Sequence, residues 1–292
     1  MEGNLLSVAG AYEVLAGYYD ELMDEIDYDF WCDYVLSLVK PVAASRESGT
    51  ASVVRAGPLP LATEAGLKGW RVLDLACGTG QFAYRLRQRG LEVTAVDISS
   101  EMLAVAEAKA RSLGLEIQFA RQDMRQLELP GSYDLVVCLC DSLNYLLEPE
   151  DLVATFGGVV QVLKPGAHFI FDINTEYKLA TVYGDQTYAA DLDDFAYIWE
   201  NEYNPDTKLC YMDLAFFIPA KTLGRSGGES EPRLFKKLTE NHVQRAFSPD
   251  LVEELLKNVG LELLGKYGDL TFDSPNSMTE RITFHCCKPA NP

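Results

Sequence analysis

The stretch that decides the fold is LDLACGTGQFA, residues 73–83. It continues an apolar run and contains the pattern Gly-x-Gly-x-x-Ala, formed by Gly78, Gly80 and Ala83. A glycine-rich turn between a buried strand and a helix lets the backbone approach a ligand closely, as in dinucleotide-binding sites. The stretch also contains a carboxylate, Asp74, ahead of the first glycine. The turn therefore predicts a bound ligand, and the carboxylate restricts what that ligand can be.

Composition and charge narrow the class of protein. The chain has 292 residues, of which 48% are hydrophobic and 24% charged, as in an ordinary globular protein. Its net charge of −19 argues against nucleic acid as the main partner, because phosphate binding needs clustered Lys and Arg. Arg85, Arg87 and Arg89 come closest to such a cluster, but we interpret them as a solvated helix face.

No apolar run approaches the roughly 20 residues that span a bilayer. The N-terminus does not resemble a signal peptide. We therefore expect a cytoplasmic protein with no membrane partner.

The cysteines do not predict a metal site. The chain has 7 of them, none in a C-x-x-C pair, and only 3 histidines. Zinc sites need cysteine and histidine ligands at characteristic spacings. Most of these cysteines lie in apolar runs, so we interpret them as small buried side chains in a reducing compartment.

Apolar runs typical of strands alternate with amphipathic helices between residues 70 and 175. The expected strands are 70–76, 91–97, 116–123, 133–141 and 167–174, and the expected helices are 81–90, 99–114 and 149–166. Strands joined by crossover helices form a parallel sheet covered on both faces. A capped helix at 248–260 and two late strands, 261–268 and 280–288, follow. The sequence therefore predicts an α/β fold with a mostly parallel, seven-stranded sheet.

The flanking segments differ in pattern from this core. Residues 11–40 have helical spacing, whereas residues 41–69 are rich in Ala, Ser, Gly and Pro and show no periodicity. Aromatic, roughly alternating runs after the fifth strand predict a small antiparallel β insertion, with a hairpin at 188–218. The expected units are an N-terminal helical lid with a variable loop at 1–69, a cofactor-binding core at 70–175, the insertion on the acceptor side at 176–245, and a completing helix and strands at 246–292.

Three acids end three consecutive strands of the expected core: Asp74, Asp97 and Asp123. The carboxyl ends of such strands form the ligand site of an open α/β sheet. A carboxylate at Asp97 suits a ribose diol, and Asp123 suits an adenine amino group, with Ile98 and Met124 able to sandwich the ring. A pyrophosphate about 4 Å from a carboxylate would be repelled by about 4 kcal/mol at an effective dielectric of 20. A ligand with an adenosine end and a cationic end fits better, and S-adenosylmethionine is such a ligand.

These residues resemble a known family. VLDLACGTGQFA resembles motif I of the class I S-adenosylmethionine-dependent methyltransferases, VTAVDISSEML their second motif, and ARQDM their third. YDLVVCLCDSLNYL and LKPGAHFIFDI resemble the fourth and fifth. The resemblance covers about residues 70–175. YDELM and HVQRAFSPDLVEELLKNVGLE resemble a bacterial subgroup of small-molecule type, many with unassigned substrates. The resemblance implies a Rossmann-like fold, methyl transfer, S-adenosylmethionine as cofactor and S-adenosylhomocysteine as product.

The resemblance also implies a set of site residues. The implied cofactor contacts are Asp74, Ala76, Gly78, Gly80, Asp97, Ile98, Met102, Asp123, Met124, Cys140 and Asp141. N-terminal aromatics often form a lid in this family, which implies Tyr12, Tyr19 and Trp31; helix packing is the alternative for each. Methyl transfer needs an aligned nucleophile and, for some acceptors, a base. The candidates are Asp141, Asn144, Tyr145 and His242. Similar sugar N-methyltransferases often carry histidine where Tyr145 stands, and a structural role is the alternative for His242.

The acceptor stays open at this level. The fourth motif is not Asp/Asn-Pro-Pro-Tyr/Phe, which disfavours amino methylation of bases in nucleic acid, and no Pro-Cys follows the fourth strand. A small molecule with an amine or hydroxyl is the leading hypothesis. The alternatives are an RNA or protein methyltransferase and a non-catalytic S-adenosylmethionine-binding protein. The aromatic hairpin is expected to cover the acceptor or to form a dimer interface, so a monomer and a homodimer are both left open by the sequence.

Overall fold

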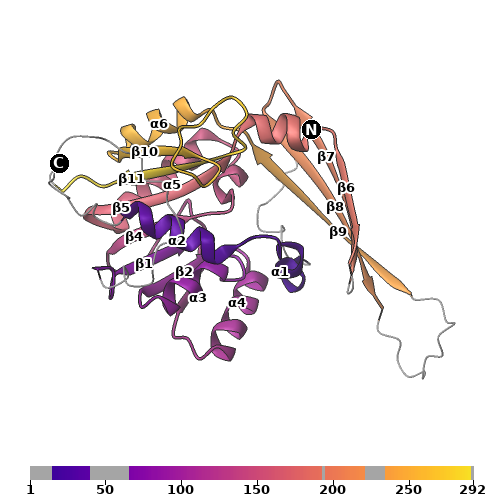
Figure 1. The fold of residues 1–292 in the computed structure, drawn as a ribbon, viewed down its shortest axis with the longest axis horizontal. Helices are drawn as coiled ribbons and strands as arrows, with labels where there is room; N and C mark the ends of the chain where they lie inside the picture. The colour runs from indigo at the N-terminus through magenta and orange to yellow at the C-terminus, as the bar shows by residue number, and fades with distance from the viewer. Residues whose placement is uncertain (1–14, 40–65, 193–194, 221–233, 291–292) are drawn as a thin grey trace, which may run out of the picture.

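A computed structural model describes residues 15–39, 66–192, 195–220 and 234–290. Its main sheet has seven strands in the order β3-β2-β1-β4-β5-β11-β10 (Figure 1). The strands are β1 (Arg71–Leu75), β2 (Glu92–Asp97), β3 (Gln118–Arg121), β4 (Tyr133–Cys138), β5 (Leu163–Asn174), β10 (Glu262–Gly268) and β11 (Arg281–Cys287). The first five are parallel, and β11 is antiparallel to both β5 and β10. The predicted mostly parallel seven-stranded sheet is confirmed.

The strand order reverses beside β1. From β1 the chain first builds outward through β2 and β3, and then returns to place β4 and β5 on the other side. A crevice opens at the carboxyl ends of the strands where such a reversal occurs, because the connections diverge to opposite faces. The glycine-rich turn that follows β1 lies at this point.

Helices cover both faces of the sheet. Alternate apolar residues of the strands point to opposite faces, which is why the core divides into two clusters. One cluster packs under α5 (Pro149–Val162) and α6 (Pro249–Asn258), and the other under α2 (Tyr28–Val39) and α3 (Gln81–Gln88). The remaining crossover helix, α4 (Ser100–Ser112), packs on β2 and β3. The Ser99 hydroxyl caps α4 and the Ser248 hydroxyl caps α6, as their positions in the sequence predict.

The N-terminal segment is not the continuous helix that the spacing at 11–40 predicts. Its described part consists of a 3₁₀ turn η2 (Leu15–Gly17), a short helix α1 (Tyr19–Leu22) and α2. The break has a local cause: the Asp27 carboxylate accepts a hydrogen bond of 2.9 Å from the Phe30 amide and so starts a new helix. Because of this break, α1 can leave the direction of α2 and lie near the crevice.

Arg85 of α3 and Arg89, which follows the last residue of α3, are also not the solvated side chains that the sequence suggests. Arg85 and Arg89 lie one turn apart, on one face of the helix, and both ion-pair with Asp29 of α2. Arg89 also pairs with Asp33. Their side chains are only 22% and 13% exposed. They therefore fasten α2 to α3 and do not form a phosphate-binding surface.

A second, four-stranded antiparallel sheet projects from the core and is called the arm below (Figure 1). Its strands are β6 (Thr187–Asp191), β7 (Ala196–Asn204), β8 (Leu209–Pro219) and β9 (Phe235–Arg245). The predicted antiparallel insertion after the fifth strand is confirmed, and β9 extends the expected hairpin. Two short elements lie where the arm meets the core. The first is η4 (Ser142–Tyr145), which contacts β9, and the second is the π-helix η5 (Lys178–Tyr183), which connects β5 to β6. Among the described residues, no helix is long and apolar enough to cross a bilayer.

Candidate functional site

The glycine-rich turn after β1 forms the floor of a cleft at the carboxyl edge of the sheet. Ala76, Gly78 and Gly80 all have left-handed backbones, with φ of 60°, 54° and 82°. A Cβ atom on Gly78 would meet nothing within 4 Å, so this side of the turn is open to a ligand. A Cβ atom on Gly80 would lie 2.9 Å from Tyr84 Cε1 and 3.1 Å from Ala106 Cβ. Gly78 therefore lines the cleft, whereas Gly80 permits the close packing of α3 on α4.

Asp74 is a buried carboxylate that faces this cleft. It is 2% exposed, and the Ala83 amide in the first turn of α3 donates to it. Its Oδ2 atom is buried and has no hydrogen-bond partner among the described residues. Burial, and then the charge of Asp97, raise the pKa of Asp74 to about 7. A buried carboxylate oxygen without a partner is costly unless a ligand pairs with it, so this site suits a cationic group.

Asp97 joins the end of β2 to the glycine-rich turn. One of its oxygens accepts a hydrogen bond of 2.8 Å from the Gly78 amide, and the other accepts one of 2.8 Å from the Ser99 amide. Burial raises the pKa of Asp97, although these amide donors oppose that shift. A carboxylate has further lone pairs beyond these two hydrogen bonds, so Asp97 can still accept from a ligand's hydroxyl groups.

The end of β3 borders a second hollow that adjoins the cleft. The two hollows share Ala76, Asp97, Ile98, Met124 and Tyr145. Asp123 lies in the second one and accepts from Arg125 Nη2 at 2.6 Å and from Arg125 Nε at 3.0 and 3.1 Å. These hydrogen bonds lower the pKa of Asp123. Arg125 was not predicted from the sequence. It keeps Asp123 ionised and occupies much of the hydrogen-bonding capacity of the Asp123 carboxylate.

The loop after β4 has an unusual backbone. Cys140 and Asp141 are consecutive non-glycine residues with positive φ, 57° and 52°. Such residues are strained and persist only where the surroundings hold them. Their amides both donate to the Asp172 carboxylate, at 3.2 and 2.7 Å. Arg281 Nη1 lies 3.0 Å from Asp172, and Arg281 Nη2 donates to Asp141 at 2.7 Å.

Asp172 and Arg281 therefore shape the cleft without lining it. Asp172 is completely buried, which raises its pKa although Arg281 opposes the shift. Burial would also raise the pKa of Asp141, but Arg281 lowers it below the usual range. Neither Asp172 nor Arg281 emerged from the sequence. Arg281 follows Asp141 by 140 residues, and nothing local signals that they meet.

Two of the expected catalytic residues lie outside the cleft. Both carboxylate oxygens of Asp141 are engaged, by Arg281 and by Gln244 Nε2 at 2.6 Å. Asn144 is 0% exposed, and its amide group bonds the backbone of Asn174 and Arg245 at 2.8–3.0 Å. These contacts join the end of β9 to the loop after β4, so both residues hold the arm on the core.

Tyr145 and His242 do come together. The Tyr145 hydroxyl lies 3.2 Å from His242 Nδ1, and His242 Nε2 lies 3.1 Å from Glu240 Oε2. The other Glu240 oxygen accepts from the Leu15 amide at 2.7 Å. Tyr145 lines the cleft, whereas His242 is buried behind it on β9. The arrangement is a Tyr–His–Glu chain with its first member at the cleft.

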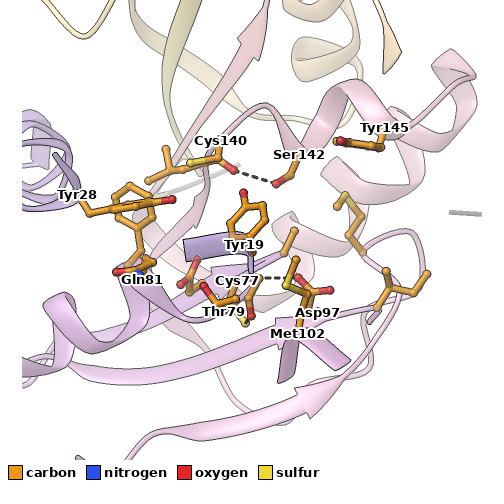
Figure 2. Close-up of a pocket in the computed structure, with 17 residues that line it drawn as sticks. Tyr19, Tyr28, Cys77, Thr79, Gln81, Asp97, Met102, Cys140, Ser142 and Tyr145 are labelled. Carbon is orange, nitrogen blue, oxygen red and sulfur yellow. Dashed lines mark hydrogen bonds between the residues drawn. The ribbon is translucent and has the colours of Figure 1, made fainter. Parts of the chain in front are cut away.

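The aromatic residues of the N-terminal segment have different positions. Tyr19 of α1 lies over the centre of the cleft, with Cys140 and Ser142 on one side and Thr79 and Asp97 on the other (Figure 2). Trp31 does not line the cleft and packs on Phe82 and beside the Arg281 guanidinium, 5.1 Å from its ring centroid. Tyr12 falls outside the described residues.

Of the remaining expected contacts, Met102 of α4 also lines the cleft. Ser142, a further candidate after the fourth strand, lines it as well, and the lining residues that the sequence did not predict are Tyr28, Cys77, Thr79, Gln81, Phe82 and Leu139.

Comparison with known proteins identifies the family. Residues 72–166 match the methyltransferase domain family. The chain is 35% identical to the putative methyltransferase YqeM of Bacillus subtilis, over 95% of this chain and 97% of that protein. The chain is a class I S-adenosylmethionine-dependent methyltransferase. An S-adenosylmethionine-dependent methyltransferase from Clostridium acetobutylicum has the same fold, with a TM-score of 0.74, 33% identity, and coverage of 94% of this chain and 98% of that one.

A more distant structure shares the fold, arm included. The sugar N-methyltransferase KedS8 from Streptoalloteichus superposes with a TM-score of 0.65 and 14% identity, over 99% of both chains. The cofactor of the present chain is S-adenosylmethionine, and the charge and open floor of the cleft suit it. Within the described part of the chain, one Asp74 oxygen has no partner and can face a cationic group, and Gly78 leaves the floor open.

Proposed function

We propose that this methyltransferase transfers a methyl group from S-adenosylmethionine to an amine nitrogen or hydroxyl oxygen of a small molecule. The observation that carries this proposal is the Tyr145–His242–Glu240 chain, which begins at the cleft and ends in a buried carboxylate. Amines and hydroxyls must lose a proton when they are methylated, and such a chain can accept it. The match to a sugar N-methyltransferase along the whole chain supports a small acceptor.

The cofactor would lie along the carboxyl edge of the sheet. Asp97 would accept from the two ribose hydroxyls, and Ile98 and Met124 would hold the adenine between them, with Asp123 near its amino group. Asp74 would face the positively charged part of the methionine portion. When bound, S-adenosylmethionine supplies a methyl carbon that is already activated by its sulfonium. Alignment of the acceptor then becomes the main task of the protein.

The proton would leave through the chain of three side chains. His242 Nδ1 accepts from the Tyr145 hydroxyl in the tautomer whose Nε2–H donates to Glu240. As the acceptor's nitrogen or oxygen gives its proton to the Tyr145 oxygen, the phenol proton moves to His242 Nδ1. The Glu240 carboxylate stabilises the resulting imidazolium. Every proton has a place, and no other reagent is needed.

The first test is transfer of a labelled methyl group from S-adenosylmethionine into separated pools of small metabolites, RNA and protein. We expect label in the small-metabolite pool. Tyr145→Phe and His242→Gln should lower the turnover number by roughly 10²- to 10⁴-fold, with little change in affinity for S-adenosylhomocysteine. His168→Gln, on the far part of the sheet, serves as the matched control. Label confined to RNA or protein would contradict a small-molecule acceptor.

A further inference from the structure

Lys178 carries a partly buried ammonium on the arm side of the cleft. It begins the π-helix η5, just beyond the carboxyl end of β5. Single π-helical turns are frequent at functional sites, because they displace side chains from regular helical positions. Here the turn brings the Lys178 ammonium over the ring of Tyr183, 5.3 Å from the ring centroid.

This ammonium has no carboxylate partner within the described residues. Neither an ion pair nor a hydrogen bond of its Nζ atom occurs there. Asp141, Glu280 and Asp172 are near enough to act on it electrostatically, but both Asp141 oxygens bind Arg281 and Gln244, and Asp172 pairs with Arg281. Burial, and then the charge of Arg281, lower the pKa of Lys178. A partly buried ammonium with no directly bonded counter-ion among the described residues is costly, so its retention points to a ligand.

A second unpaired donor lies beside the same tyrosine. The Trp199 ring, on β7 of the arm, has its centroid 5.5 Å from that of Tyr183. Its Nε1 atom is shielded from solvent and has no acceptor within the described part of the chain. Buried indole N–H groups ordinarily have a partner. Tyr183 thus has an unsatisfied ammonium on η5 and an unsatisfied indole N–H on the arm as neighbours.

Lys178 lies near the methyl-transfer region, and Tyr183 connects it to Trp199 on the arm. Cys140 lines the cleft, and the following residue, Asp141, acts electrostatically on Tyr19, Lys178 and Tyr183. Tyr19 covers the cleft, while the other two lie toward the arm. An acceptor that reaches the cleft from the arm side would therefore pass these two donors.

We propose that Lys178 and Trp199 bind an anionic group, a carboxylate or a phosphate, of the methyl acceptor. This inference rests on the proposed small-molecule function and adds the chemical class of the acceptor. The ammonium supplies the charge, the indole N–H supplies a directed hydrogen bond, and Tyr183 holds the lysine in place. The chain as a whole carries a charge of −19 and would repel an anionic acceptor. The positive charge of Lys178 would offset this repulsion locally.

The first experiment measures anion binding directly, without an acceptor. The protein, saturated with S-adenosylhomocysteine, is titrated with inorganic phosphate and, separately, with acetate. The indole N–H signal of Trp199, assigned with Trp199→Phe, is followed by NMR. We expect a saturable shift that Lys178→Met weakens by roughly 10- to 100-fold, the range for a charged hydrogen bond. Lys178→Arg should retain most of it.

Lys266→Met is the matched control, because Lys266 lies on β10 in an ion pair with Glu253. It should behave as the wild type. The relative response to phosphate and acetate shows which anion the site prefers. A Trp199 signal that responds to neither anion, or that responds equally in Lys178→Met and the wild type, would overturn the proposal.

The second experiment separates the metabolite pool by anion exchange before labelled methyl transfer. We expect the labelled product in the anionic fraction, and a raised KM with nearly unchanged kcat for Lys178→Met. Label only in the neutral or cationic fraction would refute the anionic acceptor while leaving small-molecule methyl transfer intact. Absence of label from every metabolite fraction would count against the proposed function itself, whereas the NMR titration decides the anion site independently.

Discussion

Asp74 shows how one residue can define the chemistry of a cleft. Carboxylates pair poorly with phosphates, and that repulsion separates this glycine-rich turn from a dinucleotide site. In the structure Asp74 is buried, one of its oxygens has no partner in the described ranges, and its pKa is raised to about 7. The Asp74 carboxyl therefore gains or loses its proton within the physiological pH range. Its ionised form is the one that attracts a cationic ligand.

We expect affinity for S-adenosylmethionine to increase as pH rises through about 7, because Asp74 then ionises beside the cationic ligand. S-adenosylhomocysteine lacks the sulfonium charge and should show a weaker dependence. Asp74→Asn should bind more weakly and lose most of this pH dependence. Calorimetric titration of both ligands between about pH 5.5 and about pH 8.5 measures this. Asp134→Asn is the control, since Asp134 pairs with Lys164. Equal pH profiles in Asp74→Asn and the wild type would rule out Asp74 as the cause.

The same titration affects folding with a definite sign. The pKa of Asp74 in the fold, about 7, lies above its unfolded value of about 3.9. The free folded protein therefore loses stability as pH rises between these values. A bound cationic ligand offsets this loss of stability because it pairs with ionised Asp74. Binding of the cofactor would therefore stabilise the folded protein.

At the scale of elements, the turn between β1 and α3 owes its two glycines to different causes. Both have positive φ, but a side chain has open space at Gly78 and a contact of 2.9 Å at Gly80. The ring that Gly80 would meet belongs to Tyr84, whose hydroxyl donates to the Thr79 carbonyl at 2.9 Å and so keeps the ring in place. Gly80 thus sets the approach of helices, and Gly78 sets the approach of a ligand.

Gly80→Ala should lower the free energy of unfolding by about 2–3 kcal/mol, from the left-handed backbone and the overpacked ring together. Gly157 provides the contrasting case: it lies inside α5, and a Cβ there would meet nothing within 4 Å. Gly157→Ala should stabilise the protein by up to about 1 kcal/mol, the helix-propensity difference. Urea unfolding of both variants tests the pair, and a neutral Gly80→Ala would show that the turn can relax.

At the scale of the whole molecule, β11 connects distant parts of the chain. Its first residue, Arg281, holds the strained loop after β4 from across the sheet. Further along β11, His285 Nε2 lies 3.0 Å from His168 Nδ1 on β5. Burial, and then the charge of His168, lower the pKa of His285 to about 4. The strand therefore supports the cleft at one end and carries a proton-sensitive pair further along.

The histidine pair makes folding sensitive to acid. The folded pKa of His285, about 4, is below its unfolded value of about 6.5. Its contribution is fully present above pH 6.5 and is lost as pH falls toward 4. His285→Gln should therefore flatten the decline in Tm between about pH 7 and pH 5, measured by circular dichroism. His242→Gln, on the arm, is the comparison variant. If Tm declines as steeply in His285→Gln as in the wild type, the pair does not cause the acid sensitivity.

Much of the fold could be predicted because its signals are local. The alternation of apolar runs and capped helices predicts the sheet, and the turn residues predict the arm. The acids at the ends of β1 and β2 were also predictable, since each directly follows an apolar run, and both line the cleft. The break at Asp27 was missed because helical spacing continues on both sides of it.

The sequence alone determined the cofactor, because Asp74, Gly78 and Asp97 lie in short contiguous stretches whose geometry is set by the strand and turn that contain them. Only the tertiary structure decided what surrounds the methyl-transfer region. Asp172, Arg281 and Gln244 reach Asp141 from β5, β11 and β9, and Lys178 and Trp199 meet at Tyr183 from η5 and the arm. Contacts between segments so far apart along the chain depend on how the sheets and their connections close in space, and local spacing contains no information about that closure.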